Sequence, residues 1–460
     1  MKEKKEKVKI RLSVDSSMSQ LLQYGETLEV IDKFLPGLAE KTRSHQTVQG
    51  FSLRRLVSYA GIPDAQERMQ QIEDALGKLE IYVSPEEAGI YRADYPLTFE
   101  AAELHPSERC GEIASEGVRR DTKGKRIQAH GGALFYEDGV YYWYGENKDR
   151  TDGINRIWTW GIRAYRSEDL YNWEDIGLII PPELENPMCG LYPERHTDRP
   201  HIVYCKKTKK YVCWIKQSGE EACFMVLQAE RFMGPYKMIK EGYRPFGYSV
   251  GDFDIAVEKE SGNAYLFMDA NHGGIIGMKL TEDYLFAQRE VSRQYEGLKP
   301  PFCREGIALF EHGGKKYMLT SGMTGYLPNK SDLAVSDSWE KPFVSIGDPH
   351  RGDESKASFN SQISQVFHVP GTECYIVLGD RWVPDFPVDR KAADIIERYV
   401  ACRYDPEHFS VTEQEKRFVM SSPMLASANT SVAEYVWLPV SFEPDGRPFV
   451  AWQDSWRVKE

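Results

Sequence analysis

Acidic and amide side chains recur next to apolar runs along the last three quarters of the chain. Carboxylates stand in the segments Tyr144–Glu146, Gly251–Asp254 and Arg304–Gly306, and an amide stands in Asn360–Gln362. Carboxyl groups that share one pocket can donate and accept protons, which is the work of a general acid and a general base. Each of them can also be an ordinary ion-pair partner, and Glu305 directly follows a basic residue. The residues by themselves leave both interpretations open.

Only a fold that gathers distant loops around one centre brings these motifs together. From about residue 129 one unit recurs: an apolar strand, a polar turn that often contains Gly, and a second apolar strand. The copies start roughly 50–75 residues apart, and they cover residues 131–146, 201–216, 254–269, 306–322, 363–380 and 437–454. This spacing is typical of the blades of a β-propeller, whose loops meet at a common axis.

Two of the turns, in residues 137–140 and 444–447, contain Asp-Gly, the strongest short signal for a hairpin. Six hairpins fit five blades if the last strand region closes the ring against the first, and such closure removes exposed sheet edges. We therefore predict a mainly β fold, with a five-bladed β-propeller over residues 129–460. A large β-sandwich is the alternative, but its strands usually follow one another at shorter and more even intervals.

The first part of the chain has a different pattern. Between residues 15 and 80, apolar residues recur at three- and four-residue spacing, which predicts amphipathic helices. We predict a small α-helical domain over residues 1–80. Residues 81–128 are predicted to be a connector that packs on the propeller, because three prolines interrupt any long helix there.

The composition excludes several classes of partner. The chain has 460 residues and is 41% hydrophobic, which is enough for a sizeable core, and its net charge of −12 argues against nucleic acid or an anionic membrane as a partner. A neutral polar ligand suits it better, and the aromatic content of 12% fits stacking on sugars as well as a β-rich core. No run of about 18 apolar residues exists, so no membrane span is predicted.

The eight cysteines are scattered, and none forms a C-x2-C pair. We therefore predict neither a disulfide framework nor a metal site, and no cofactor. Free thiols are typical of the cytosol. The basic start of the chain has no apolar stretch behind it, which is not the pattern of a secretory signal. We expect a cytoplasmic protein.

The propeller part resembles glycoside hydrolase family 43 and is most similar to the branch related to exo-β-1,3-galactanases. Its motifs follow the family's order from about residue 127 to 456: QAHGG at 128–132, YYWYGENK at 141–148, YRSEDLYNW at 165–173, DRP at 198–200, REGIALF at 304–310, LTSGMTGYLPN at 319–329, SQ at 361–362 and GDRW at 379–382. Met323 stands where the branch has Cys, and Tyr326 where it has Trp. The helical part loosely resembles small domains appended to bacterial glycoside hydrolases.

The resemblance implies an exo-acting glycosidase that cleaves β-galactosidic, β-1,3-galactan-like oligosaccharides with inversion, and arabinosides or xylosides are the alternative substrates. It assigns the general acid to Glu305 and the carboxylate that tunes this acid to Asp252. Asp254 is a rival on the same face of the strand and a candidate for substrate binding. Gln362 and Glu146 line the pocket of the branch. Since an amide is a poor base, Gln362 is expected to hold the attacking water, while Glu146 binds sugar hydroxyls or assists that water.

Most of the wider family places an Asp on the first blade as general base. The corresponding segment here, residues 128–132, has no carboxylate, an absence that the galactanase-like branch shares. This absence supports a second hypothesis, a carbohydrate-binding propeller without catalysis. A buried carboxylic acid at Glu305 would favour the enzyme, because a binding module does not need one. A scaffold for protein partners is disfavoured by the number of polar motifs near the predicted axis.

Five further residues are candidates for contacts with the substrate. His130 is placed near the axis or is a structural histidine, and Trp143 and Trp382 stack on sugar rings or pack in the core. Arg199 either orients carboxylates or caps a strand, and Arg381 joins the set through the GDRW motif. An oligosaccharide is therefore the predicted partner. The N-terminal helices are a candidate contact for an oligomer.

Overall fold

The computed structural model describes residues 7–43, 52–59, 64–85, 87–98, 109–153, 155–219, 222–386, 388–422 and 429–458. Contacts within the chain define two compact units, one made of residues 1–95 with 425–428 and the other of residues 96–424 with 429–460. The boundary after residue 95 falls inside the predicted connector. The domain limits at residues 80 and 128 stay predictions.

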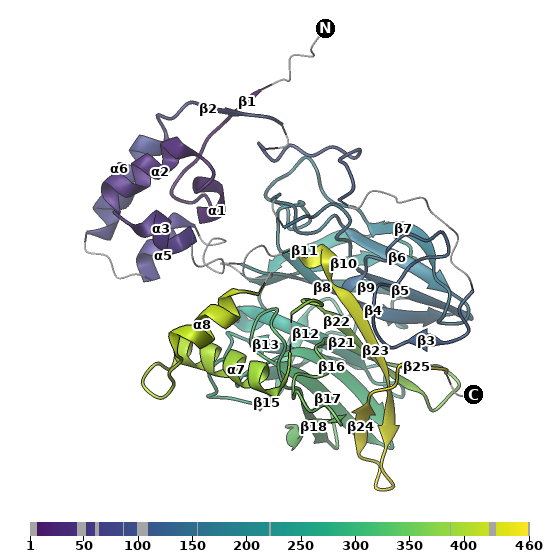
Figure 1. Ribbon diagram of the computed structural model, residues 1–460. Helices are drawn as coiled ribbons and strands as arrows, with labels where there is room; N and C mark the ends of the chain where they lie inside the picture. The colour runs from purple at the N-terminus through teal and green to yellow at the C-terminus, as the bar shows by residue number, and fades with distance from the viewer. Residues whose placement is uncertain are drawn as a thin grey trace. The chain divides into compact units, whose positions relative to one another are not determined.

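The first unit is mainly helical (Figure 1). Its elements are β1 (Val8–Ile10), α1 (Met18–Leu21), α2 (Gly25–Phe34), α3 (Leu38–Arg43), α5 (Leu53–Tyr59), α6 (Ala65–Leu76) and β2 (Ile81–Val83), and β1 pairs with β2 antiparallel. Ser17 and Gln20 form a capping box at the start of α1, which satisfies backbone groups that a helix end leaves free. The apolar faces meet in one core that includes Met18, Ile31 and Ile72. The helices predicted between residues 15 and 80 are confirmed.

The second unit contains five sheets that each form one blade of a propeller, and their strands are antiparallel except for the pair β20 and β24. The strands of blade one are β4 (His130–Glu137), β5 (Val140–Glu146), β6 (Ile162–Ser167) and β7 (Glu174–Ile180). Those of blade two are β8 (Thr197–Cys205), β9 (Lys210–Gln217), β10 (Cys223–Ala229) and β11 (Lys237–Tyr243). Those of blade three are β12 (Val250–Val257), β13 (Ala264–Ala270), β14 (Ile275–Leu280) and β15 (Ala287–Gln294).

Blade four consists of β16 (Arg304–His312), β17 (Lys315–Gly322), β18 (Asp332–Ser336) and β19 (Val344–Gly347). Blade five has five strands in the order β20 (His350–Arg351), β24 (Pro448–Ala451), β23 (Glu434–Phe442), β22 (Tyr375–Arg381) and β21 (Gln362–His368). The second unit also contains a short strand pair and two 3-10 turns. The pair is β3 (Ile113–Ala114) with β25 (Ser455–Trp456), and the turns are η1 (Pro245–Gly247) and η2 (Thr430–Val432). The predicted mainly β, five-bladed propeller is confirmed.

The first strands of the five blades form the inner ring. β4 contacts β8, β8 contacts β12, β12 contacts β16, β16 contacts β21, and β21 returns to β4. The sixth predicted hairpin, β23 with β24, extends blade five by pairing with β22. Blades one and five share a buried cluster that includes Trp143, Phe367 and Trp437. Because Trp437 lies on β23, the last strand region packs against the first blade through its side chains, while its backbone pairs within blade five.

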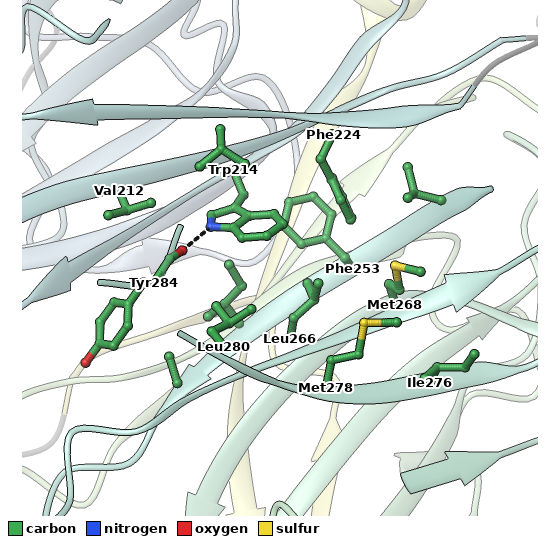
Figure 2. Packing of buried hydrophobic residues seen from close by; sticks show 14 of the residues in the cluster. Val212, Trp214, Phe224, Phe253, Leu266, Met268, Ile276, Met278, Leu280 and Tyr284 are labelled. Carbon is green, nitrogen blue, oxygen red and sulfur yellow. Dashed lines mark hydrogen bonds between the residues drawn. The ribbon is translucent and has the colours of Figure 1, made fainter. Parts of the chain in front are cut away.

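Buried side chains fill the space between neighbouring blades. Figure 2 shows the cluster between blades two and three, where the Trp214 indole packs beside Phe224 and donates a 2.9 Å hydrogen bond to the Tyr284 carbonyl. These strands are apolar on both faces because each blade is covered on both sides by its neighbours. This two-sided burial makes a rigid frame for the polar residues at the strand ends.

The turn residues in the sequence explain the hairpins, but two helices were not predicted. Asp138 and Gly139 both have positive φ, 49° and 87°, as the predicted Asp-Gly turn requires. Two helices, α7 (Arg390–Tyr404) and α8 (Glu413–Met420), stand between β22 and β23 in blade five, where only strands were expected. No helix in the described ranges is long and apolar enough to cross a membrane.

Candidate active site

The polar motifs lie at the starts of the inner strands. Asp252 is near the start of β12, Glu305 near the start of β16, and Gln362 opens β21. Arg199 lies near the start of β8, and Glu146 ends β5 opposite the first residue of β4. Since these inner strands run side by side around one ring, their first residues gather at the same end of the propeller.

Every inner strand has a register shift within its first residues. The shifts fall between residues 130 and 133, 198 and 201, 250 and 253, 305 and 308, and 363 and 365. A bulge of this kind inserts an extra residue and turns a side chain away from the regular pleat. Gly131, Arg199 and Gly306 have positive φ at three of these bulges. The bulges therefore change the directions of the side chains at Arg199, Asp252 and Glu305.

Polar contacts connect all five blades. The Arg199 amide donates to Glu146 Oε1 at 2.9 Å, and the Arg199 Nε pairs with Asp252 Oδ2 at 2.9 Å. Asp252 Oδ2 also accepts from the backbone amide that follows Glu305, at 3.1 Å, and Gln362 Nε2 donates to Glu305 Oε1 at 3.4 Å. The predicted catalytic residues Glu146, Asp252, Glu305 and Gln362 are thus brought together.

Glu305 is partly buried and has no cationic partner in direct contact among the described residues. Burial, together with the negative charge of Asp252, raises the pKa of Glu305 to about 8, although the Lys216 ammonium opposes this shift. At neutral pH the carboxyl group therefore holds its proton. A protonated carboxyl group with a weak hydrogen-bond partner is what a general acid needs.

Asp252 has the opposite environment. Lys216 Nζ lies 2.7 Å from Oδ1, and Arg199 Nε lies 2.9 Å from Oδ2. Burial alone would raise the pKa of Asp252, but the two cations outweigh it and hold the pKa well below its usual range. Asp252 therefore stays ionised beside Glu305 and keeps that acid protonated.

Gln362 is held in a defined orientation. Its Nε2 donates to Ser321 Oγ at 3.2 Å as well as to Glu305, and its Oε1 accepts from Trp382 Nε1 at 2.9 Å. The Trp382 ring in turn lies edge-on to Tyr326, with 5.2 Å between centroids. The indole thus fixes which end of the amide faces Glu305.

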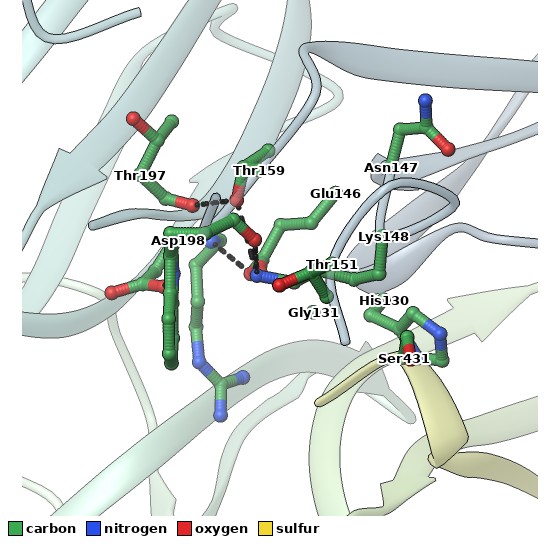
Figure 3. A network of polar contacts seen from close by, with 12 residues as sticks. His130, Gly131, Glu146, Asn147, Lys148, Thr151, Thr159, Thr197, Asp198 and Ser431 are labelled. Carbon is green, nitrogen blue, oxygen red and sulfur yellow. Dashed lines mark hydrogen bonds and ion pairs between the residues drawn. The ribbon is translucent and has the colours of Figure 1, made fainter. Parts of the chain in front are cut away.

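Glu146 belongs to a buried network that Figure 3 shows. Its Oε2 pairs with Lys148 Nζ at 2.8 Å, and Lys148 Nζ also donates to the Trp158 carbonyl at 2.8 Å and to Thr159 Oγ1 at 3.0 Å. Burial raises the pKa of Glu146 to about 7 in spite of its ion pair with Lys148. Glu146 is 3% exposed, and both of its oxygens accept from neighbours. These contacts hold Glu146 in place between Lys148 and the Arg199 backbone.

His130 is fully buried and has partners on both ring nitrogens. Nδ1 lies 2.9 Å from Asp380 Oδ1, Nε2 lies 2.8 Å from Gln128 Oε1, and the ring stacks on Tyr435 at 4.9 Å. Burial lowers the pKa of His130. The alternative of a structural histidine therefore describes this residue.

Three of the predicted site residues contact structural neighbours rather than the predicted catalytic residues. Trp143 is 1% exposed and its ring contacts Trp437 and other aromatic rings, so it packs in the core and offers no face to a sugar. Asp254 pairs with His201 at 2.9 Å and accepts from the Leu309 amide at 2.7 Å, which ties β12 to its neighbours. Arg381 donates to the Asn360 and Phe359 carbonyls and pairs with Glu116. The observed contacts of all three are structural.

Several residues near the catalytic group were not predicted as site residues. Lys216 and Lys148 supply the cations described above. The phenol of Tyr326 lies within the field of four carboxylates, which together with burial raise its pKa. Asp269 is fully buried near Glu305 and Asp252, and its Oδ2 lies 2.6 Å from His272 Nδ1. Only Lys148 and Tyr326 stand inside a recognised motif, so the sequence offered no signal for the others.

Among the described residues, no group of three or more His, Cys, Asp or Glu side chains is placed to hold a metal ion. Cys189, Cys205, Cys213, Cys303 and Cys402 are free thiols. The chemistry of the site therefore has to be assigned to carboxyl, amide and cationic side chains.

Solved structures share this propeller. The family 43 β-1,3-galactosidase BT0265 is 28% identical over 76% of this chain, with a TM-score of 0.59, and the match spans 64% of the length of that protein. The exo-β-1,3-galactanase from Phanerochaete chrysosporium, solved with β-1,3-galactotriose, has the same TM-score at 21% identity, over 76% of this chain and 68% of its own. The enzyme of the same name from Clostridium thermocellum reaches 0.56 at 24% identity, over 75% of this chain and 66% of its own. No curated protein matches the sequence.

A family model matches residues 133–378, more than half of the chain. The matched stretch contains Glu146, Asp252, Glu305 and Gln362, and therefore all four predicted catalytic residues. The model is that of the glycosyl hydrolases family 43, and this chain belongs to that family.

Proposed function

We propose that this protein is an exo-acting, inverting glycosidase that releases galactose units from β-1,3-galactan-like oligosaccharides, with Glu305 as the general acid. Membership of family 43 supports hydrolysis of a glycosidic bond. The 28% identity with a β-1,3-galactosidase supports the choice of sugar. Because the chain spans only 64% of that relative, activity and substrate are both part of the proposal.

One observation carries the proposal. Two neighbouring carboxyl groups have opposite protonation: Asp252 is ionised between Lys216 and Arg199, while Glu305 has a pKa of about 8. Two carboxyl groups whose environments push their pKa values apart are the usual arrangement for acid catalysis at neutral pH. A module that only binds sugar has no need of a carboxylic acid that is kept protonated.

Gln362, the proposed second group at the glycosidic bond, supports a mechanism with inversion of the anomeric carbon. Glu305 donates its proton to the glycosidic oxygen as the bond to the anomeric carbon breaks, and a water molecule attacks that carbon from the opposite face. Gln362 is the group that Trp382 orients toward this pocket, and its Oε1 keeps one lone pair for that water. An amide does not form the glycosyl ester of a retaining enzyme. Glu146 is 3% exposed and ion-paired with Lys148, so the proposal assigns this role to Gln362.

The test compares wild-type protein with Glu305→Gln on β-1,3-galacto-oligosaccharides and on aryl β-galactosides, arabinosides and xylosides. We expect galactose release by the wild type and a loss of kcat of at least about 100-fold in the variant, since general acid catalysis contributes factors of this size. Glu311→Gln is the matched control, because Glu311 lies on the same strand but pairs with Lys316 at the surface. NMR of the first product formed reports the anomeric configuration, and retention would contradict the inverting mechanism.

The main alternative is a carbohydrate-binding propeller without catalysis, supported by the missing carboxylate in residues 128–132. Oligosaccharide binding by calorimetry with no sugar release from any substrate would favour it. Release of arabinose or xylose alone would keep the hydrolase and overturn the galactoside assignment.

We also propose that the enzyme acts in the cytoplasm on short imported oligosaccharides. The buried free thiols of Cys205, Cys213 and Cys303 support this location. Cell fractionation with an antibody against the native protein tests it, and recovery from the culture medium or the cell surface would contradict it. The role of the N-terminal helices in an oligomer stays a prediction, which light scattering of the full chain checks.

A further inference from the structure

A second cavity lies beside blade four, outside the cluster of catalytic residues. Its volume is about 300 Å³, which is at the lower end of the range for small-ligand sites. One wall is the loop between β17 and β18, with Thr324, Asn329 and Lys330, and the facing wall is α7, with Arg390 and its neighbours. The mechanism proposed above uses none of these side chains.

The cavity adjoins the catalytic pocket. Arg304 lines the cavity, and the next residue, Glu305, is the proposed acid. The same loop that contributes Thr324 to the cavity also carries Tyr326, whose phenol lies near the catalytic carboxylates. The cavity and Glu305 are thus associated with consecutive residues at the start of β16.

The helical wall is specific to blade five. The second and third strands of the other blades are joined by residues 147–161, 218–222, 271–274 and 323–331, whereas β22 and β23 are joined by residues 382–433. This long connection contains α7 and α8, and α7 supplies Arg390, Ala393, Asp394, Ile396 and Glu397 to the cavity. The insertion thus builds a binding surface rather than a simple turn.

The charges in the cavity oppose the charge of the protein. The chain has a net charge of −12, yet four cations, Arg304, Lys330, Lys356 and Arg390, line this cavity against two carboxylates. One of these, Asp394, is already paired with Arg390 at 3.2 Å. Arg304 is 8% exposed, and its hydrogen bonds go to neutral oxygens, the Thr320 Oγ1 at 3.0 Å and the Thr320 and Lys330 carbonyls at 2.8 and 3.0 Å. A concentrated positive charge in a hollow attracts an anionic group.

We propose that this cavity is an accessory subsite for an anionic unit of the substrate, a sugar bearing a carboxylate or a sulfate ester, held by Lys330, Lys356 and Arg390. Phe302, which is 38% exposed at the cavity, offers an apolar face to the ring of that sugar. The inference rests on the proposed glycosidase function. It narrows the substrate class to galacto-oligosaccharides that carry an acidic unit on the leaving-group side of the cleaved bond.

The experiment compares kcat/KM for a neutral β-1,3-galacto-oligosaccharide with that for the same chain carrying a uronic acid or a galactose sulfate on its leaving-group side. We expect wild type to prefer an acidic substrate by about tenfold or more, and the preference to weaken as salt rises. The variant Lys330→Gln with Lys356→Gln should lose most of this preference. Lys391→Gln is the matched control, because Lys391 is an exposed cation on α7 that does not line the cavity.

Equal rates for neutral and acidic substrates in the wild type, or a preference that survives in the double variant, would overturn the subsite. A uronate that is preferred over a sulfate, or the reverse, identifies which acidic group the subsite takes. If the wild type cleaves no substrate, calorimetry of the acidic and neutral oligosaccharides with wild type and the double variant still decides the subsite. Inorganic sulfate that binds as tightly as the acidic oligosaccharide would reduce the cavity to a general anion site and also contradict the proposal.

Discussion

The polar residues of blade one and Glu305 of blade four lie on one ring of contacts, but they differ in how completely they are partnered. In blade one, Glu146 pairs with Lys148 at 2.8 Å and His130 has partners at 2.9 and 2.8 Å on its two nitrogens. In blades three and four, the cations lie against Asp252, and within the described part of the chain Glu305 receives one hydrogen bond, a long one of 3.4 Å from Gln362.

This difference distinguishes residues that stabilise the fold from residues that can transfer a proton. A buried group whose hydrogen bonds are all made is a structural element, because moving its proton breaks those bonds. A carboxyl group that is buried beside an ionised neighbour, without a strong partner of its own, keeps a raised pKa and a proton to give. We therefore expect changes at Glu305, or at the Asp252 charge that raises the pKa of Glu305, to act on catalysis, and changes in blade one to act on stability.

The largest expected effect is that of Asp252→Asn on activity. Since the charge of Asp252 raises the pKa of Glu305, its removal lowers that pKa, and the acid loses its proton at a lower pH. The basic limb of the kcat/KM profile should move to lower pH, and kcat should fall about 100-fold or more. Asp254→Asn is the contrast, because Asp254 touches His201 and the Leu309 amide instead. If the basic limb of the kcat/KM profile stays at the wild-type pH in Asp252→Asn, the charge of Asp252 does not set the pKa of Glu305.

The next effect is that of Glu146→Gln on stability. The substitution leaves the Lys148 ammonium, which is fully buried, without its carboxylate. We expect a loss of about 1–3 kcal/mol in the free energy of unfolding, measured with urea at pH 5, because the buried ammonium loses a hydrogen-bond acceptor. Burial raises the pKa of Glu146 from 4.5 to about 7, so the wild type loses stability as the pH rises through this range and the Gln variant does not. The difference between the two proteins should therefore shrink toward pH 8.

Glu174→Gln is the control for this measurement, because the pair that Glu174 makes with Arg166 is exposed and should change stability by less than about 1 kcal/mol. A Glu146→Gln variant that keeps its stability but loses activity would place Glu146 in the chemistry and contradict the division drawn here.

A smaller effect is expected at Trp382. Trp382→Phe keeps an aromatic ring but removes the N–H that donates to Gln362 Oε1 at 2.9 Å. The freed amide should lower kcat about tenfold, which corresponds to one hydrogen bond of about 1.4 kcal/mol, with little change in KM. Trp452→Phe removes a similar N–H bond, to Asp454 at the surface, and should leave kcat unchanged. Equal kcat values for wild type and Trp382→Phe would mean that the orientation of Gln362 does not matter.

The smallest effect concerns the pH dependence of stability. Burial lowers the pKa of His130 from 6.5, so the unfolded chain binds this proton more readily than the folded one. The contribution of His130 is therefore fully present above pH 6.5 and is lost as the pH falls below that value. In His130→Gln the decline of Tm between about pH 6.5 and 5 should be shallower than in wild type, whereas His408→Gln, at an exposed position, should follow wild type. Parallel curves for wild type and His130→Gln would contradict this linkage.

The fold was largely predictable because hairpins are local. Apolar runs joined by Gly-containing turns, such as the one at Asp138 and Gly139, fix strand pairs over few residues. The strand that the last hairpin pairs with was not predictable. β23 pairs with β22 across the 52 residues 382–433, and no short-range pattern specifies this pairing. Helices α7 and α8 were missed for a related reason: the repeat of strands on both sides outweighed the helical pattern that starts at the Asp389 cap.

For the site, the sequence by itself determined the carboxylates and the amide, because their motifs are contiguous: Glu146, Asp252, Glu305 and Gln362 each stand in a short recognisable segment. Only the tertiary structure decided what each one does. The pKa of Glu305 depends on burial and on Asp252, Lys216 and Asp269, which come from other strands. Electrostatic interaction depends on distance in space rather than in sequence. The sequence therefore supplies the chemical groups, and the closed ring of blades sets the burial and the neighbouring charges on which the proposed role of each group depends.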